Sequence, residues 1–422
     1  MQRVVKRAVS FMLALAFLLA AAGCFDYHEP EEVAWVLAIG LDKGRQNVLT
    51  MTAVVAIPKS IAGGGGGPSG PGGGGGGRKF QTVSMEVPTL LSGLELLNSV
   101  IDRRTDLSHT KWIVFSRELA EEDIGRYLAP LARFRQFRRT TTIVISQVRA
   151  GDFLNRGVPV LEDNVGKYYE LLWRGWRYTE FIPYDTFHQF YIRAKSPGTA
   201  PVAVLASTER KAPVYPDSSP KPKGVYEAGR LPREGGGGIE VAGAAVFNGG
   251  RMMGTLNGDE TGMAKMLEGT FRRTILSLPD PRHPDKYVIV EVKLRRQPHV
   301  EVRINKEGLP VIKVEAHLEG DIISIQSMED YERPEKIPII EGAVRERLLE
   351  DMNRAVAKSL EWGVDFMGFG LHAKKLFRTW QEWENYRWNE KFARASISVN
   401  LDFKVRRIGL LHESIPITGY PR

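Results

Sequence analysis

The chain has 422 residues, 43% of them hydrophobic and 26% charged, which is enough for two or three domains that each bury a core. Its formal net charge of +8 is a mild surplus, weaker than the concentrated basic patch of a nucleic-acid-binding protein, so we expect no nucleic-acid partner. The single cysteine excludes an intramolecular disulfide, a CxxC motif and a thiolate metal cluster.

Residues 1–23 have the three parts of a secretory signal peptide. Arg3, Lys6 and Arg7 give a cationic start, an apolar stretch runs from Phe11 to Ala22, and small residues precede a cleavage site. The apolar stretch is shorter than the roughly 20 residues that a membrane-spanning helix needs. We therefore expect a signal peptide that is cleaved, not a permanent membrane span.

The lone cysteine follows this segment directly. Ala21-Ala22-Gly23-Cys24 resembles the lipobox of bacterial lipoproteins, in which the cysteine receives a diacylglyceryl group and becomes the first residue; Ala21 stands where Leu or a branched aliphatic residue is usual. Two acyl chains hold a protein firmly, since each buried methylene contributes about 0.8 kcal/mol. The sequence therefore predicts a lipid on Cys24 and a mature chain at the outer face of the cell membrane. The alternative is a plain secretory signal whose cysteine falls at the cleavage site.

The first part of the mature chain, residues 24–207, predicts an α/β domain. Two short apolar runs, Glu32–Leu41 and Val48–Ile57, are joined by a glycine-containing turn and predict a hairpin. The glycine-rich tract 63–77 cannot bury side chains, so we expect a flexible loop there. Beyond it, the patterns predict alternating helices and strands. These are a helix from Leu90 to Ile101, a strand at Trp112–Ser116, a helix at Ile124–Phe134 and a strand at Thr140–Val148.

Residues 208–238 are rich in Pro and Gly and predict either an interdomain linker or a long surface loop. The remaining part, 239–422, predicts a C-terminal α+β domain with a mainly antiparallel sheet. Its four alternating runs are Val288–Leu294, Val300–Ile304, Ile312–Leu318 and Ile397–Val405. A long amphipathic helix from Val344 to Leu360 should cover the buried face, and Leu376, Trp380 and Trp383 predict a second helix. The fold class is thus mixed α/β, with several domains and mixed or antiparallel sheets flanked by helices.

No motif indicates chemistry. HExxH and GxSxG are absent, so we expect no catalytic residues, cofactor or metal, and His317 should be a solvated residue on a strand. An arginine cluster is either a solvated helix end or a contact with lipid head groups. Its members are Arg133, Arg135, Arg138 and Arg139. Three tryptophans of the aromatic-rich C-terminal part are either core or a partner interface. They are Trp380, Trp383 and Trp388.

Several blocks, in the same order along the chain, resemble the Ger(x)C spore-germination lipoproteins, which usually have Trp where this chain has Phe25. The blocks are Gly23-Cys24-Phe25-Asp26 with Glu29, Ile39-Gly40-Leu41-Asp42-Lys43-Gly44, Ser108-His109-Thr110-Lys111, Gly243-Ala244-Ala245-Val246-Phe247 with Gly254-Thr255-Leu256, Asp365-Phe366-Met367-Gly368-Phe369-Gly370, Trp380 with Trp383, and Val405-Arg406-Arg407-Ile408-Gly409.

This resemblance implies a subunit of a nutrient germinant receptor that works beside two integral membrane subunits in the inner membrane of a spore. It also implies a multi-part α/β fold of mixed sheets and assigns no catalytic residues. Two alternatives from other classes stay open. One is a lipoprotein that captures a small solute for a transporter, which would need a cleft with converging polar groups. The other is an enzyme that acts on the cell wall.

Overall fold

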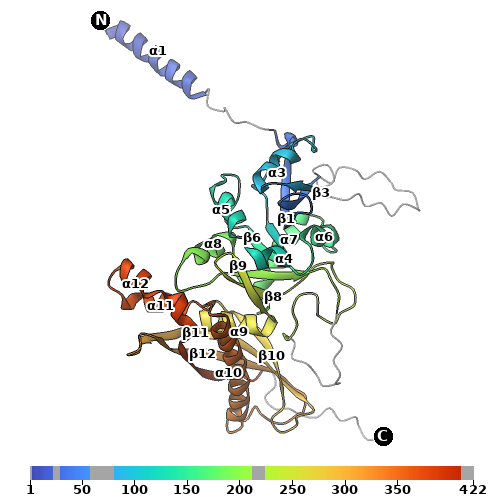
Figure 1. The fold of residues 1–422 in the computed structure, drawn as a ribbon, viewed down its shortest axis with the longest axis vertical. Helices are drawn as coiled ribbons and strands as arrows, with labels where there is room; N and C mark the ends of the chain where they lie inside the picture. Colours follow the sequence, from blue (N-terminus) through green and yellow to red (C-terminus); the bar gives the residue numbers. More distant parts are fainter. Residues whose placement is uncertain (1, 22–28, 58–79, 212–223, 410–422) are drawn as a thin grey trace, which may run out of the picture.

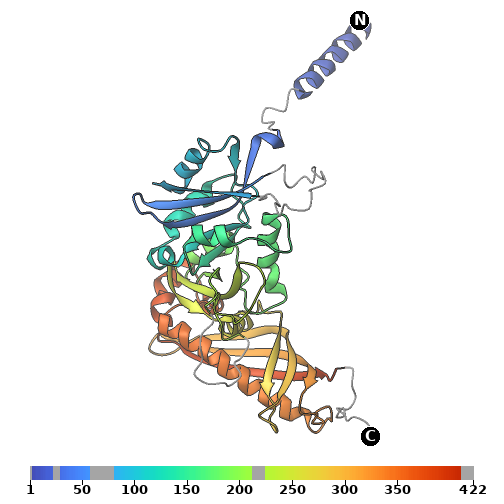
Figure 2. The ribbon, with the colours of Figure 1, turned by 90° about the vertical axis from the view of Figure 1, so that its right-hand side faces the viewer.

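The computed structural model describes residues 2–21, 29–57, 80–211 and 224–409. After an N-terminal helix, α1 (Gln2–Ala21), the strands form a nine-stranded sheet and a four-stranded sheet. The larger sheet lies toward the end at which the chain enters the body, and the smaller sheet lies at the opposite end of the long axis (Figures 1 and 2). The predicted mixed α/β fold with more than one part is confirmed.

The helix α1 covers most of the segment that the sequence predicts to be a signal peptide. Among the helices of the described ranges, none has both the length and the apolar character needed to cross a bilayer. Cys24 and the glycine-rich tract 63–77, with their predicted lipid and flexible loop, lie outside the described residues.

The predicted hairpin is confirmed: β1 (Val33–Lys43) and β2 (Leu49–Ala56) pair antiparallel. Asp42 is buried in β1, and its carboxylate accepts the N–H groups of Ala150 (2.8 Å) and Gly151 (2.9 Å) at the start of α6 (Ala150–Arg156). A carboxylate at this position satisfies N–H groups that have no partner inside the helix. The hairpin therefore also positions α6.

The large sheet has a parallel centre, in which β1, β5, β6 and β7 run side by side, and antiparallel strands on both flanks. Besides β1 and β2, the strands of this sheet are β3 (Phe80–Val87), β4 (Arg104–Asp106), β5 (Trp112–Ser116), β6 (Thr142–Ser146), β7 (Val202–Ser207), β8 (Glu240–Asn248) and β9 (Arg251–Leu256). The strands predicted at Trp112–Ser116 and within Thr140–Val148 are confirmed. Both are buried throughout, as expected for parallel strands covered on both faces.

Helices cover the two faces of this sheet and form separate apolar clusters with it. The helices on one face are α3 (Leu90–Leu97), α4 (Arg117–Glu122), α5 (Gly125–Arg133) and α8 (Phe187–Lys195). The other face carries α6, α7 (Val165–Trp173) and the short η2 (Arg174–Arg177). The predicted helices α3 and α5 are confirmed, although α3 ends before Ile101.

The segment 208–238 joins β7 to β8, and these two strands are antiparallel neighbours in one sheet. The segment therefore lies, in the chain, between two strands of one sheet. Because β8 and β9 follow this loop and complete the large sheet, the first structural part reaches beyond residue 239. The helix α9 (Gly258–Glu268) comes next. It packs against β8 of the large sheet and against β11 (Tyr287–Ile304) and α10 (Ile337–Trp362) of the second part, so it joins the two sheets.

The second sheet has the strand order β10-β11-β12-β13. Its strands are β10 (Arg273–Pro279), β11 (Tyr287–Ile304), β12 (Pro310–Ile325) and β13 (Ser396–Arg407). The mainly antiparallel arrangement is confirmed, but β13 is parallel to β12. The two runs predicted as separate strands, Val288–Leu294 and Val300–Ile304, are one strand, β11, whose register shifts between Leu294 and His299.

The predicted cover of this sheet is confirmed by α10 (Ile337–Trp362), which buries Val344, Leu348 and Met352 against it. The single second helix predicted from Leu376, Trp380 and Trp383 is wrong. Instead the chain forms α11 (Phe369–Ala373), η3 (Lys374–Leu376), α12 (Trp380–Tyr386) and α13 (Trp388–Phe392). The chain breaks at Thr379, whose hydroxyl caps α12, and at Arg387, whose positive φ of 54° ends it.

Candidate anchoring and contact surfaces

The body begins close to the predicted lipid site. Glu29 is the first described residue after Cys24, and η1 (Pro30–Glu32) leads directly into β1. Val33 is already buried in the large sheet. Only five peptide bonds therefore separate Cys24 from the first described residue of the folded body.

The predicted arginine cluster lies at the end of α5 and in the turn that leads to β6, and all four of its side chains are exposed. Phe137, between them in the sequence, is buried and packs edge-on against Phe187 with ring centroids 5.0 Å apart. Burial lowers the pKa of His109, and the nearby charge of Arg138 lowers it further. The His109 ring in turn lies 4.3 Å from that of Trp35 in β1. The cluster thus flanks the edge of the sheet at which β1 begins.

Of the three tryptophans predicted as a partner interface, the structure places Trp383 and Trp388 in the core, 1% and 0% exposed, with ring centroids 5.8 Å apart. Neither ring has surface to offer a partner, because both fill the apolar cluster under α11–α13. Trp380 differs, since 48% of it is exposed. The ammonium group of Lys374 lies 4.5 Å from the Trp380 ring centroid, within cation–π range.

A buried carboxylate, to which the sequence analysis gave no role of its own, holds this aromatic region together. Asp365 accepts the N–H groups of Phe369 (3.0 Å) and Gly370 (2.7 Å) and the indole N–H of Trp388 (3.0 Å). Burial raises the pKa of Asp365 to about 6. The block from Asp365 to Gly370 therefore has a structural role, and we call it the Asp365 clamp. The Asp365 carboxylate holds the backbone N–H groups at the start of α11 and the Trp388 ring in place.

The loop before β7 packs closely against this segment through Gly198. A Cβ on Gly370 would lie 2.3 Å from the Cα of Gly198, and Gly198 itself has a φ of +91° and packs against the Trp383 ring. Only glycine fits such a close approach of two backbones. The two glycines thus join the large sheet to the helices of the second part.

A second junction contains buried charges. Lys265 of α9 is 4% exposed, and its ammonium donates to the backbone carbonyl of Ile182 at 2.9 Å and to two neighbouring carbonyls. Burial lowers the pKa of Lys265 to about 8. Beside it, Arg193 of α8 pairs with Glu268 of α9. Burial raises the pKa of the nearby Asp185 to about 7. These groups fix α9 against the segment that precedes α8.

A cleft of about 440 Å³ lies between α9, β10, β11 and α10. Its lining combines apolar side chains with Glu180, Asp259, Arg347 and Asp351. Arg347 pairs with Asp351 at 2.9 Å, yet burial still raises the pKa of Asp351 above its ordinary value. The cleft therefore combines apolar side chains with a few charged ones, as many sites for small ligands do.

The prediction that His317 is solvated is wrong. His317 is 6% exposed, and Arg296 donates to its Nε2 at 2.9 Å. Asp402 of the neighbouring strand lies 3.5 Å from its Nδ1. The register shifts of β11 on both sides of Arg296 bring that guanidinium over the imidazole, which the alternating pattern alone does not show.

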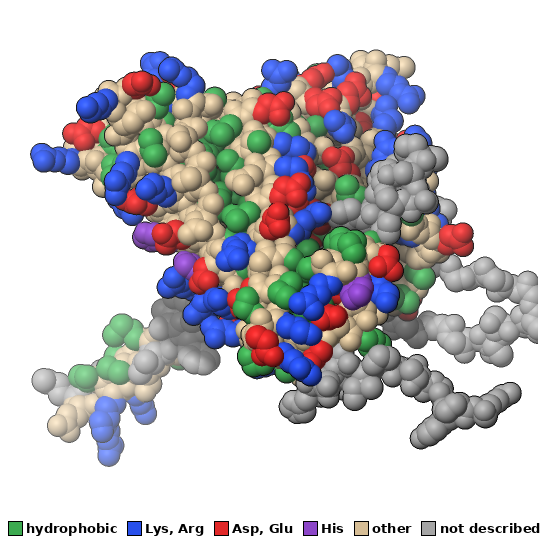
Figure 3. Space-filling view, turned by 90° about the horizontal axis from the view of Figure 1, so that it is seen from below, with side chains coloured by type: hydrophobic (Ala, Val, Ile, Leu, Met, Phe, Trp, Pro, Cys, Tyr) green, Lys and Arg blue, Asp and Glu red, His purple; other side chains and the backbone are tan. Residues whose placement is uncertain are grey.

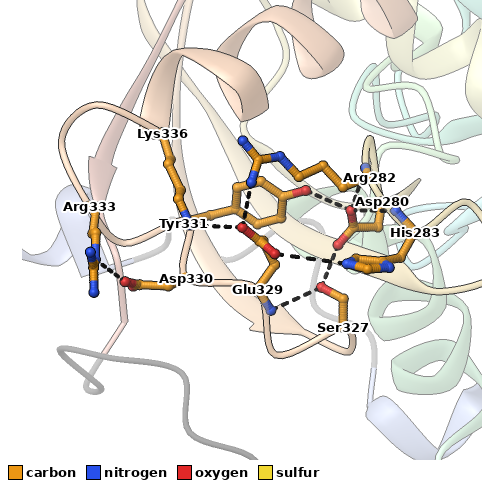
Figure 4. Close-up of polar contacts among 9 residues, drawn as sticks. All are labelled: Asp280, Arg282, His283, Ser327, Glu329, Asp330, Tyr331, Arg333 and Lys336. Carbon is orange, nitrogen blue, oxygen red and sulfur yellow. Dashed lines mark hydrogen bonds and ion pairs between the residues drawn. The ribbon is translucent and has the colours of Figure 1, made fainter.

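At the far end of the second sheet, a polar network ties the β10–β11 turn to the start of α10 (Figure 4). Asp280 accepts the hydroxyl groups of Ser327 (2.5 Å) and Tyr331 (2.6 Å). Although burial alone would raise it, these bonds hold the pKa of Asp280 below its ordinary value. Glu329 pairs with Lys336 at 2.7 Å. The Asp280 and Glu329 carboxylates are thus both engaged within the chain, so the network is structural.

The surface seen from this end carries Lys and Arg side chains beside Asp and Glu side chains (Figure 3). Within the described ranges, no group of three or more His, Cys, Asp or Glu side chains is placed to hold a metal ion. The fold and these surfaces define a two-sheet α/β protein whose candidate sites are contact surfaces and a cleft.

Two family models match the chain. "Spore germination protein N-terminal domain" matches residues 26–208, and "Spore germination B3/GerAC like, C-terminal" matches residues 242–409. Together the matches take in most of the chain and both of its sheets. The chain belongs to the GerAC-like family of spore germination proteins.

Curated relatives agree with this assignment. Spore germination protein KC of Bacillus subtilis (strain 168) is 24% identical, covering 97% of this chain and 98% of its own length. Spore germination protein B3 of the same strain is 19% identical, with 96% and 99% covered. The crystal structure of the GerBC protein matches with a TM-score of 0.48 and 13% identity, covering 87% of this chain and 96% of that one.

Proposed function

We propose that this chain is the lipid-anchored subunit of a spore nutrient germinant receptor. Acylated Cys24 holds it at the outer face of the spore inner membrane, and it acts by contact with two integral membrane subunits, without catalysing a reaction. One observation carries the proposal: a family match across both parts of the chain is combined with a lone cysteine directly after an apolar segment.

Two surfaces support this role. The exposed arginine cluster flanks the edge at which β1 begins, where guanidinium groups can pair with anionic lipid head groups. Trp380 of α12, Leu371 of α11 and Leu376 of η3 are all exposed, and these short helices project from the body (Figure 1). Exposed aromatic and aliphatic side chains of this kind are typical anchors of protein contacts.

The anchor is tested with Cys24→Ala in the full chain, expressed in a sporulating host. The variant should lose palmitate labelling, leave the spore membrane fraction and fail to support nutrient germination, because no other cysteine can take the lipid. Phe25→Trp is the matched control, since it keeps Cys24 and should remain acylated. Retention of lipid and membrane location by Cys24→Ala would contradict the proposal.

Partner contact is tested by co-purification of the chain with multispanning proteins from spore membranes. Trp380→Ala should reduce this recovery, because it removes the half-exposed ring of the contact surface. Tyr178→Ala is a matched control, since Tyr178 is 76% exposed and belongs to the end of η2, outside α11–α13. An unchanged yield with Trp380→Ala, or an equal loss with the control, would remove this surface from the proposal.

A second candidate function, capture of a small solute, is favoured by the cleft between α9 and α10. Titration calorimetry of the chain with amino acids and sugars tests it. Tight binding that is lost in Arg347→Met, which removes a charge from the cleft lining, would favour solute capture. Absence of binding heat would leave the contact function as the better account.

A further inference from the structure

The end of α3 and the turn that follows it lie beside the point at which the chain reaches the folded body. Glu31 and Glu32 line the same surface hollow as Asn98 and Ile101. Val33, the first residue of β1, pairs with Arg104 of β4, which follows α3 directly. In Figure 1, α3 accordingly lies at the end of the molecule that receives the N-terminal segment.

This region exposes apolar side chains. Leu96 in α3 is 46% exposed, and Val100 in the turn that follows α3 is 65% exposed. The N–H groups of Ser99 and Val100 donate to the carbonyls of Leu96 and Leu97, so this turn continues the helical path and brings the two side chains to neighbouring positions. The opposite side of α3 is the one that packs on the sheet, through Leu94 and Leu97. Single exposed apolar residues are common on protein surfaces and by themselves indicate no binding site. What favours a membrane contact is the position of this pair relative to Cys24.

The position is set by the length of chain from the anchor. Five residues from Cys24 to Glu29 span at most about 18 Å when fully extended. The lipid on Cys24 must sit in the bilayer, whose head-group layer is itself about 5–7 Å thick. The part of the body around Glu31 and the end of α3 therefore cannot move far from the membrane surface.

Charges on the same edge add to this. The strands β1 and β4 begin at this edge, where Arg104 is exposed. The strands β5 and β6 begin level with Ala38, five residues further along β1, and the exposed arginine cluster precedes β6 on that side of the sheet. Guanidinium groups beside apolar side chains fit the interface of an anionic bilayer. Glu31, Glu32 and Asp102 limit the net positive charge nearby. Apolar insertion is therefore the main contribution, and charge is the second.

We propose that the C-terminal end of α3 and the turn that follows it dock on the bilayer, with Leu96 and Val100 inserted at the level of the head groups and upper acyl chains. This inference rests on the proposed acylation of Cys24 and adds a second, protein-made contact with the lipid. The large sheet then lies next to the membrane, and the sheet β10–β13 stands at the far end of the long axis, away from it (Figures 1 and 2).

The single cysteine makes a sharp test possible, because acylation of Cys24 leaves the chain without a free thiol. Val100→Cys in the acylated full chain is labelled with a nitrobenzoxadiazole dye and reconstituted into vesicles of phosphatidylcholine and phosphatidylglycerol. Ile323→Cys is the matched control, since Ile323 is 52% exposed and lies in β12 of the far sheet. Both variants should keep the circular dichroism spectrum of the unaltered chain, because both positions are exposed.

Insertion predicts a blue-shifted emission at position 100, quenching by lipids that carry a spin label in the acyl chain, and dithionite reduction several-fold slower than at position 323. If the labelled protein floats with the vesicles but the dye at position 100 behaves like the control, α3 does not dock, while the anchor stands. If the protein does not float with the vesicles at all, the proposed acylation fails and the docking fails with it.

Discussion

The two buried tryptophans next to Asp365 give a direct test of the Asp365 clamp. Trp388 donates its indole N–H to Asp365 at 3.0 Å, whereas the buried indole N–H of Trp383 has no hydrogen-bond partner within the described part of the chain. Changing either to Phe removes a similar part of a fully buried ring. The transfer and cavity costs should therefore be similar in the two variants.

The hydrogen-bond contributions differ in sign. Trp388→Phe loses a bond to a charged acceptor, which contributes about 1.5–3 kcal/mol, whereas Trp383→Phe removes an unpaired buried donor, whose burial costs about 1–3 kcal/mol. Trp388→Phe should therefore lower the free energy of unfolding by about 3 kcal/mol more than Trp383→Phe. Urea unfolding followed by circular dichroism measures both. Equal losses, or a larger loss for Trp383→Phe, would refute the assigned role of Asp365.

The pH dependence gives a second measure of the same contact. Burial raises the pKa of Asp365 to about 6, above its ordinary value of 3.8, while the bond from Trp388 opposes this rise. A carboxyl group with a raised folded pKa contributes stability that is fully present below pH 3.8 and is lost as the pH rises through about 6. In Trp388→Phe the pKa rises further, so the loss of stability should extend to higher pH.

Three further predictions concern the junctions and caps. Gly370→Ala should lower the free energy of unfolding by about 3 kcal/mol or more, because its Cβ would lie 2.3 Å from the Cα of Gly198. Gly342→Ala in α10, where the new Cβ meets no close contact, should raise the free energy of unfolding by about 0.5–1 kcal/mol. Thermal unfolding compares the two variants. The lowered pKa of Lys265, about 8 against 10.5, predicts a contribution to the free energy of unfolding that rises as the pH rises from about 8 to 10.5 and is constant at its lower value below pH 8. Lys265→Met should flatten this slope in urea titrations. Thr379→Ala removes the cap of α12 and should cost about 1 kcal/mol, measured by urea unfolding.

Local patterns predict the elements whose side chains meet one sheet face or one helix face. The strand at Trp112–Ser116 has the predicted bounds. A strand of a parallel sheet is covered by helices on both faces, so its whole length is apolar and the apolar run marks where it begins and ends. The helix α10 is predicted because its apolar positions recur along one face. Both results depend on spacing within the element itself, and the sequence carries that spacing directly.

Elements that depend on distant partners could not be predicted. In β10, Arg273 and Ile275 are both exposed, so apolar and polar residues do not alternate clearly along the strand. The strand forms because its backbone pairs with β11. The spacing of Leu376, Trp380 and Trp383 suits one helix, but the hydroxyl of Thr379 caps a new helix there. Leu376 is consequently exposed, whereas Trp383 is in the core.

The same limit applies to the candidate sites. Asp365 is an ordinary acid in a glycine-containing segment, and its partner Trp388 lies 23 residues further along the chain. His317 seemed solvated because the strand alternates, yet Arg296 reaches it across a register shift. The segment 363–370 does contain one sequence signal, three glycines within eight residues, which is typical of a tight turn. In the structure, Gly363 and Gly368 adopt positive φ.

The two sheets are fixed to each other at two separate places. Gly198 packs against Gly370 beside the aromatic cluster, and Lys265 of α9 holds the carbonyl of Ile182 from within the core. Two buried junctions on different elements resist rotation in a way that one exposed linker does not, and the default expectation of free domain motion therefore does not hold here. A membrane contact at the large sheet and a partner contact at Trp380 would consequently constrain the same body. A movement of the large sheet relative to the membrane would therefore also move the surface around Trp380.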